Sequence, residues 1–126
     1  METPTLTDVR TVAISVVDQD RAVAFYVEEL GFELRLDASI GNGLRWIEVA
    51  PQGATTSIAL ASGRERPGAE VDTGIRLSTG DAAQEHANMQ HRAVDVDELL
   101  RWPNVPLMSR FRDPDGNVVY VVEQTS

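Results

Sequence analysis

An internal repeat limits the folds available to this chain more than any other feature of its sequence. Two short apolar runs, each followed by an acidic residue, recur at an interval of 63 residues. The matched positions are Val12, Ile14, Val16 and Asp18 in the first run and Ile75, Leu77, Thr79 and Asp81 in the second. In both halves the acidic residue precedes a stretch with helical spacing, where a carboxylate can cap the first turn. The repeat therefore predicts two copies of one unit that begins with a strand and a helix.

Each copy continues with three further strands. The first copy has a predicted helix at 21–30 and strands at 11–17, 32–36, 44–49 and 55–61. The second has a predicted helix at 82–91 and later strands at 93–96, 107–112 and 118–123. The segment 62–70, SGRERPGAE, has the polar, Gly- and Pro-containing composition of a linker. We therefore predict an α+β fold in one domain, 1–126, made of two βαβββ modules at about 8–61 and 71–124 that are joined by this linker.

Composition excludes several classes of function. Eleven Lys and Arg against 20 Asp and Glu give a formal charge of -9, the wrong sign for binding nucleic acid or an anionic membrane. With no cysteine, the chain lacks disulfides, a thiolate nucleophile and an iron–sulfur cluster. No apolar run is long enough to span a bilayer, and the first ten residues lack the pattern of a signal peptide. We expect a cytoplasmic protein whose partners are neither nucleic acids nor membranes.

Four short motifs follow one another along the chain. They are VVDQDRAVAFY at 16–26, LGF at 30–32, RW at 45–46 and FRDPDGN at 111–117. Capping or turn chemistry explains each motif separately, and 113–117 alone is typical of a tight connection between two strands. Together, in this order within the duplicated plan, the motifs resemble the vicinal oxygen chelate superfamily, the group of glyoxalases, bleomycin-resistance proteins and extradiol dioxygenases.

The resemblance implies a half-open, U-shaped mixed β-barrel built from both modules, with the helices outside and a cavity on the concave side. It also implies a homodimer, in which the barrel is completed within one chain or between modules of two chains. Strand alternation, applied to this plan, sorts the side chains into a helix-facing set and a cavity-facing set. The residues expected to line the ligand-binding cavity are Thr11, Ala13, Ser15, Trp46, Glu48, Ala59, Gly74, Arg76 and Tyr120.

Metal-dependent members of the superfamily place His, Glu or Gln ligands at four positions on these inner faces. The corresponding residues here are Thr11, Ala59, Gly74 and Tyr120. A divalent ion prefers carboxylate, imidazole or amide donors, and moving each strand by one residue does not supply such a set. His86 and His91 lie five residues apart on the second predicted helix, so they are expected in surface or packing roles. We therefore expect no metal and no cofactor.

Two expected cavity residues and one loop each have more than one interpretation. Arg76 offers a planar fork to a carboxylate or phosphate, or it forms an internal ion pair with Glu48. Tyr120 donates a hydrogen bond to a ligand, or its ring packs in the core. The loop 99–106 contains two prolines and Trp102, and it is a cavity lid, a dimer contact, or an ordered loop that tucks the indole into the core.

Without a metal, the sequence predicts a protein that binds a small organic molecule and holds or sequesters it, as the resemblance to bleomycin-resistance proteins implies. The net charge fits a cationic ligand through long-range attraction. The alternative is an enzyme: a lyase, isomerase or dioxygenase that uses a divalent metal, or a metal-free catalyst with Glu48 as base and Tyr120 as acid. A third class is a structural or regulatory module that acts through its outer surface. Whether the protein is an enzyme is left open at this point.

Overall fold

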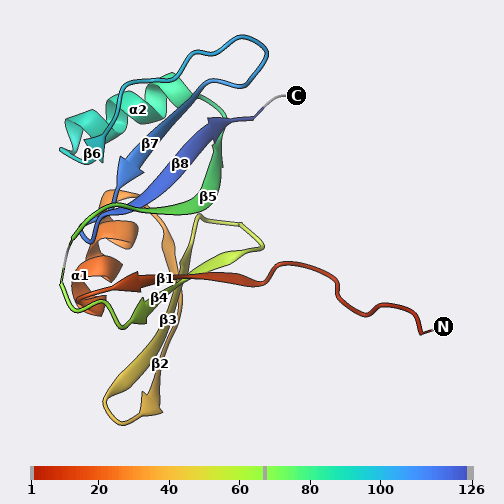
Figure 1. Ribbon diagram of the computed structural model, residues 1–126, viewed down its shortest axis with the longest axis vertical. Helices are drawn as coiled ribbons and strands as arrows, with labels where there is room; N and C mark the ends of the chain where they lie inside the picture. Colours follow the sequence, from red (N-terminus) through yellow and green to blue (C-terminus); the bar gives the residue numbers. More distant parts are fainter. Residues whose placement is uncertain (1, 67, 125–126) are drawn as a thin grey trace.

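The computed structural model describes residues 2–66 and 68–124. Two four-stranded sheets form the body of the molecule (Figure 1). The first sheet contains β1 (Thr11–Val16), β2 (Glu33–Gly41), β3 (Leu44–Ala50) and β4 (Ser57–Ser62). The second contains β5 (Val71–Thr79), β6 (Asp95–Val96), β7 (Met108–Arg112) and β8 (Asn117–Glu123). Helix α1 (Gln19–Ala24) and the π-helical turn η1 (Phe25–Glu29) follow β1, whereas α2 (Ala82–His91) follows β5.

The two sheets have equivalent topologies. Their strand orders are β1-β4-β3-β2 and β5-β8-β7-β6, and in each the first and last strands of the module are parallel neighbours. The other pairs are antiparallel, so both sheets are mixed. The sheets curl without closing into a barrel, and both helices lie on the left of the view in Figure 1. The predicted α+β plan of two βαβββ modules is confirmed.

Both predicted helix caps are present, and they explain why the repeat begins its helices where it does. Asp18 accepts a hydrogen bond from the backbone of Arg21 at 3.1 Å, and Asp81 accepts one from Gln84 at 3.0 Å. Each carboxylate satisfies an N–H group that the first helical turn leaves unpaired. The first helix therefore begins at Gln19 rather than at the predicted residue 21.

The hairpin of β2 and β3 is longer than the sequence pattern predicted. Asn42 and Gly43 have φ values of 57° and 74°, which is the left-handed backbone that a two-residue hairpin turn requires. Strand pairing consequently continues to Gly41, whereas the predicted strand ended at Leu36. The hairpin projects away from the rest of the first sheet (Figure 1).

Strand alternation places Ile14 and Val16 of β1 and Ile75 and Leu77 of β5 against the core, whereas Val12 at the start of β1 is exposed. Ile14 and Val16 are buried, whereas Ala13 and Ser15 between them are exposed. Two core clusters result, one in each module, and Phe25 packs against both. Burial of the two clusters against a shared aromatic ring joins the modules through apolar contacts as well as through the linker.

A polar clamp also joins the modules, and it is formed by the loop 113–117. Three buried side chains of this loop bond the first module. Asp113 accepts from the Tyr26 hydroxyl at 2.9 Å, Asp115 accepts from the Val17 backbone at 2.9 Å, and Asn117 donates to the Ser15 carbonyl at 3.0 Å. The interpretation of 113–117 as turn chemistry alone is therefore wrong. The loop does turn the chain, but its side chains also fix one module against the other.

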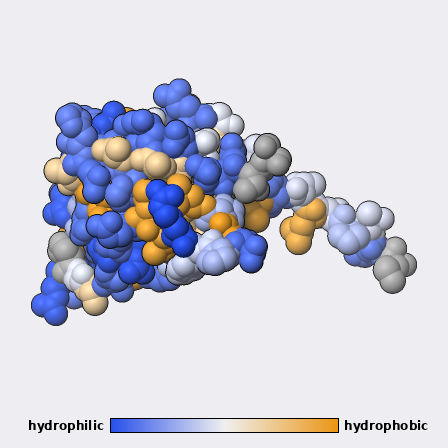
Figure 2. Space-filling model, turned by 90° about the horizontal axis from the view of Figure 1, so that it is seen from above, coloured by the Kyte–Doolittle hydropathy of each residue, from blue (hydrophilic) through white to orange (hydrophobic). Residues whose placement is uncertain are grey.

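Several apolar side chains remain exposed at three places on the surface. Trp102 is 59% exposed, so the alternative in which the loop tucks the indole into the core is wrong. Its loop projects at the top of Figure 1, and the view from that side shows apolar side chains surfacing among hydrophilic ones (Figure 2). The other places are the β2–β3 hairpin, with Ile40 and Leu44, and the N-terminal arm, with Leu6 and Val9. Within the described part of the chain, no helix is long and apolar enough to span a membrane.

Candidate functional site

Glu48 is the centre of a polar cluster on the first sheet. Its side chain is on β3 and only 3% of the residue is exposed. One carboxylate oxygen, Oε2, accepts hydrogen bonds from the Trp46 indole at 2.8 Å and from the Arg10 guanidinium at 3.0 Å. The other oxygen, Oε1, accepts from the Ser57 hydroxyl at 2.7 Å, and that hydroxyl lies 3.0 Å from the Thr11 hydroxyl. The cluster thus satisfies a buried carboxylate from three directions.

These hydrogen bonds control the charge of Glu48. The bond from Ser57 contributes most to lowering the pKa of the carboxyl, followed by that from Trp46 and then by Arg10, and the result is about 2. Glu48 is therefore ionised throughout the physiological range. Because a general base works best with a pKa near the working pH, this environment suits a structural anion better than a proton acceptor.

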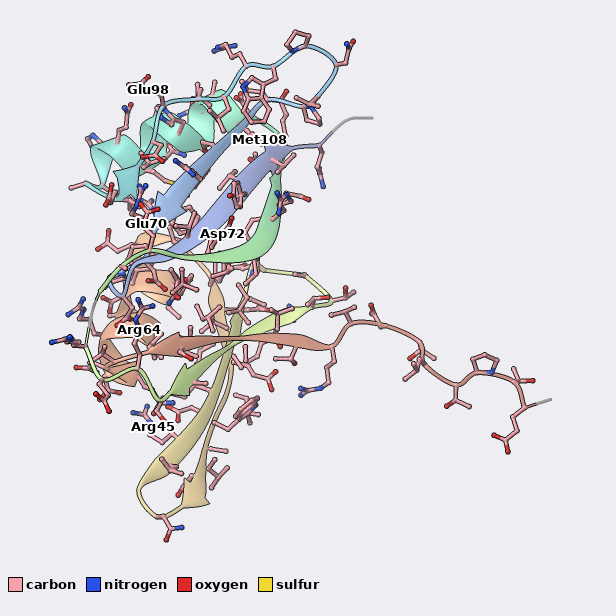
Figure 3. All side chains as sticks on the ribbon, in the orientation of Figure 1. Arg45, Arg64, Glu70, Asp72, Glu98 and Met108 are labelled. Carbon is pink, nitrogen blue, oxygen red and sulfur yellow. The ribbon has the colours of Figure 1, made fainter. Side chains whose placement is uncertain are left out.

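Arg76 and Tyr120 are cross-strand neighbours on β5 and β8 of the second sheet. The guanidinium carbon lies 4.5 Å from the centroid of the Tyr120 ring, which is cation–π geometry. The guanidinium also donates to the Gly74 carbonyl at 2.8 Å. The Tyr120 hydroxyl donates to Asp72 at 2.9 Å, and Asp72 extends from β5 as labelled in Figure 3. The tyrosine is half-buried, and its hydroxyl is held by a carboxylate rather than by the core.

The alternative in which Arg76 pairs with Glu48 is wrong. The two residues lie on different sheets, and the partner of Glu48 is Arg10. Arg10 was missed because it immediately precedes β1, and strand alternation assigns a face only to residues within the predicted strand. Ser57 was also missed, although the register that pairs Thr11 with Ser57 places their hydroxyls together.

Four of the nine predicted cavity residues line pockets of the single chain, and these four are divided among three pockets. Glu48 lines a pocket of ≈ 240 Å³ together with Arg10 and Ser57. Ala13 and Ser15 line a pocket of ≈ 470 Å³ beside the start of β5. Arg76 lines another pocket of ≈ 470 Å³ between the two modules. The structure thus brings together Thr11, Trp46 and Glu48 on one sheet, and Gly74, Arg76 and Tyr120 on the other.

The four positions that correspond to metal ligands do not fit a divalent ion. Ala59 and Gly74 have no donor atom, and the hydroxyls of Thr11 and Tyr120 are bonded to other side chains. Among residues 2–66 and 68–124, no group of three or more His, Asp or Glu side chains is placed to hold a metal. His86 is buried on α2, with Nε2 2.8 Å from the Asp97 carbonyl, whereas His91 is exposed.

Two curled βαβββ modules with their helices outside define a glyoxalase-like protein. Residues 9–121 match the model of the Glyoxalase/Bleomycin resistance protein/Dioxygenase superfamily, and the chain belongs to this family. It is 32% identical to YetH of Bacillus subtilis (strain 168) over 117 residues, which cover 90% of this chain and 95% of YetH.

Two solved structures share this fold at the same level of identity. A member of the superfamily from Sphaerobacter thermophilus DSM 20745 superposes with a TM-score of 0.85 at 32% identity, covering 94% of this chain and 98% of its own. TnmS3, an antibiotic binding protein from Streptomyces sp. CB03234, superposes with a TM-score of 0.82 at 32% identity. That match covers 98% of this chain and 100% of TnmS3.

Proposed function

We propose that this protein is a metal-free member of the family that binds and holds a small organic molecule. One observation carries the proposal: the four positions that correspond to metal ligands hold Thr11, Ala59, Gly74 and Tyr120, which are unsuited to a divalent ion. Pockets between about 240 and 470 Å³ lie beside these strands, and the larger ones fall within the usual size of small-molecule sites. The similarity to TnmS3 makes an antibiotic-like molecule the first ligand class to test.

The proposal includes a homodimer. Exposed apolar residues occur on the hairpin, on the N-terminal arm and on the loop that contains Trp102, which are far apart on one chain (Figure 1). A second copy of the chain can cover these surfaces, because a two-fold axis places each apolar patch of one chain against a patch of the other. Such an arrangement buries Ile40 and Leu44 and extends the pockets of the single chain.

Trp46 provides the test, because its indole belongs to the Glu48 cluster. In a Trp102→Phe background only Trp46 fluoresces strongly, and chelator-treated protein is titrated with a panel of aromatic antibiotics. We expect saturable quenching by at least one of them. A Trp46→Phe variant, which keeps Trp102, serves as the matched control and should respond less. A folded protein that shows neither a change in Trp46 emission nor saturable calorimetric binding of any compound in the panel would contradict the proposal.

A further inference from the structure

A pocket at the seam between the modules has an unusual charge for this chain. The seam pocket is the cavity of ≈ 470 Å³ lined by residues 51–58 and 75–78 together with Val12 and Gln124. None of these residues is Asp or Glu, although the chain has 20 acidic residues and a net charge of -9. Arg76 is the one basic residue among them. The pocket is therefore locally positive within an acidic protein, which favours an anion over a cation.

The guanidinium of Arg76 is available to a ligand. Its one hydrogen bond within the described residues is to the Gly74 carbonyl, so four of its five N–H donors have no partner there. No carboxylate oxygen of the described residues lies within 4.0 Å of it, whereas Arg110 is paired with Asp97 at 2.5 Å. The nearby Asp72 accepts from the Gly74 backbone and the Tyr120 hydroxyl, and the charge of Arg76 is among the causes that lower its pKa, although the two side chains form no ion pair. Arg76 is exposed, so these donors are accessible to a ligand from solvent, and the planar guanidinium fork suits an oxyanion.

The Tyr120 ring also orients this guanidinium. Contact of the guanidinium with the ring face at 4.5 Å restricts the plane of the fork, and the N–H groups that do not bond Gly74 have no other hydrogen-bond partner among the described residues. Beside it, the seam pocket has apolar walls from Val12, Pro51 and Leu77 and hydroxyl groups from Thr55 and Ser78. Such a pocket suits a flat apolar body that carries one oxyanion.

We propose that the seam pocket binds a small organic anion, with an apolar body against the walls and a carboxylate or phosphate on Arg76. This inference rests on the proposed function and names its class of ligand. It reverses the expectation of a cationic ligand drawn from net charge, because the lining residues and not the whole chain determine the local field.

Four naphthalene derivatives with the same apolar body separate the contribution of the oxyanion from that of the apolar body. Calorimetry compares 2-naphthoate, 2-naphthyl phosphate, neutral 2-naphthamide and cationic 2-naphthylmethylammonium on the full chain. We expect the carboxylate or the phosphate, or both, to bind about tenfold or more tightly than the amide and the cation. The stronger of the two anions identifies the preferred oxyanion. Equal binding of the amide, or tighter binding of the cation, would overturn the inference.

Two pairs of variants locate the site. Arg76→Gln should weaken binding of the anion about tenfold or more, whereas Arg66→Gln, the same charge change at an exposed residue between the modules, should leave it within about twofold. Thr55→Glu should weaken it strongly by adding a carboxylate to the pocket, and Thr55→Gln, of nearly the same size, should not. Unchanged affinity in both Arg76→Gln and Thr55→Glu refutes the seam pocket as the anion site.

The same titrations distinguish the two proposals. If no naphthalene probe binds but an uncharged or cationic antibiotic quenches Trp46, the inference about the anion fails and the proposed function stands. If nothing in either panel binds to the folded protein, the proposed function fails as well.

Discussion

Replacing Tyr26 with Phe should destabilise the protein without disturbing its apolar core. The Tyr26 ring is fully buried and contacts the rings of Phe25 and Phe32 at centroid distances of 5.1 and 5.6 Å, contacts that Phe preserves. The substitution removes only the hydroxyl that donates to Asp113 at 2.9 Å across the two modules. Tyr26→Phe therefore isolates one hydrogen bond of the clamp.

The loss of stability in Tyr26→Phe is limited by the hydrogen bonds that Asp113 retains. Its carboxylate still accepts from the Asn117 side chain at 3.0 Å and from the backbone N–H groups of Asp115 and Asn117 at 2.9 and 3.0 Å. The cost is then that of one hydrogen bond to a charged group, about 1.5–3 kcal/mol in the free energy of unfolding. With a urea slope of about 2 kcal/mol per molar, the midpoint should fall by about 1 M.

Urea unfolding followed by circular dichroism measures this shift, and Tyr120→Phe is the matched control. Tyr120 also donates to an aspartate, but that bond is exposed, so its removal should cost no more than about 0.5 kcal/mol. Equal midpoints for Tyr26→Phe and the unchanged protein would refute the clamp as a source of stability. A loss in Tyr120→Phe as large as that in Tyr26→Phe would refute the role of burial.

The same variant makes a prediction about alkaline pH. Burial, followed by the neighbouring Asp113 charge, raises the pKa of the Tyr26 hydroxyl well above its ordinary value of 10.0. In the unfolded chain the hydroxyl loses its proton near pH 10, whereas in the folded protein it stays protonated. Its contribution to stability is therefore complete below about pH 10 and is lost as the pH rises further. The free energy of unfolding of Tyr26→Phe should fall less steeply above pH 10.

Three further predictions concern acid stability, assembly and metal content. Because the pKa of Glu48 is lowered to about 2, its contribution to stability should be complete above its ordinary pKa of 4.5 and lost as the pH falls toward 2. In urea titrations Glu48→Gln should remove part of this acid dependence, and an unchanged slope would contradict the assignment. Light scattering should show a dimer that Leu44→Glu dissociates and Trp102→Ala weakens, whereas a monomer at high concentration would exclude the proposed interface. Elemental analysis of protein purified without chelator should find no stoichiometric nickel, zinc, iron or manganese. One equivalent of any of them would favour a metal-dependent enzyme over a metal-free binding protein.

The sequence predicted the features of the fold that depend on local patterns. The repeat of an apolar run and a capping aspartate requires only neighbouring residues, and Asp18 and Asp81 cap their helices as predicted. The clamp could not be predicted in this way. Asp113 and Tyr26 are 87 residues apart, and Asn117 and Ser15 are 102 apart, so their contacts depend on how the modules pack. The residue types of 113–117 are explained by the turn alone, so they gave no sign that the same side chains also bond the first module.

The candidate site was predicted in part for a related reason. Strand alternation grouped Trp46 with Glu48 and Arg76 with Tyr120, since side chains on one sheet face follow from register. It did not reveal that Arg10 pairs with Glu48, because Arg10 precedes the strand. Alternation also says nothing of the distance between two sheets, and this is why the supposed ion pair between Arg76 and Glu48 was wrong.

Calorimetry before and after treatment with a chelator tests whether this protein binds its ligand without a metal. Aromatic antibiotics and the naphthalene anions are titrated into both preparations of the folded protein. We predict saturable binding of at least one compound, with one affinity and one stoichiometry in both preparations. Binding that disappears with the chelator and returns only with a divalent ion, or no saturable binding at all, would contradict metal-free binding.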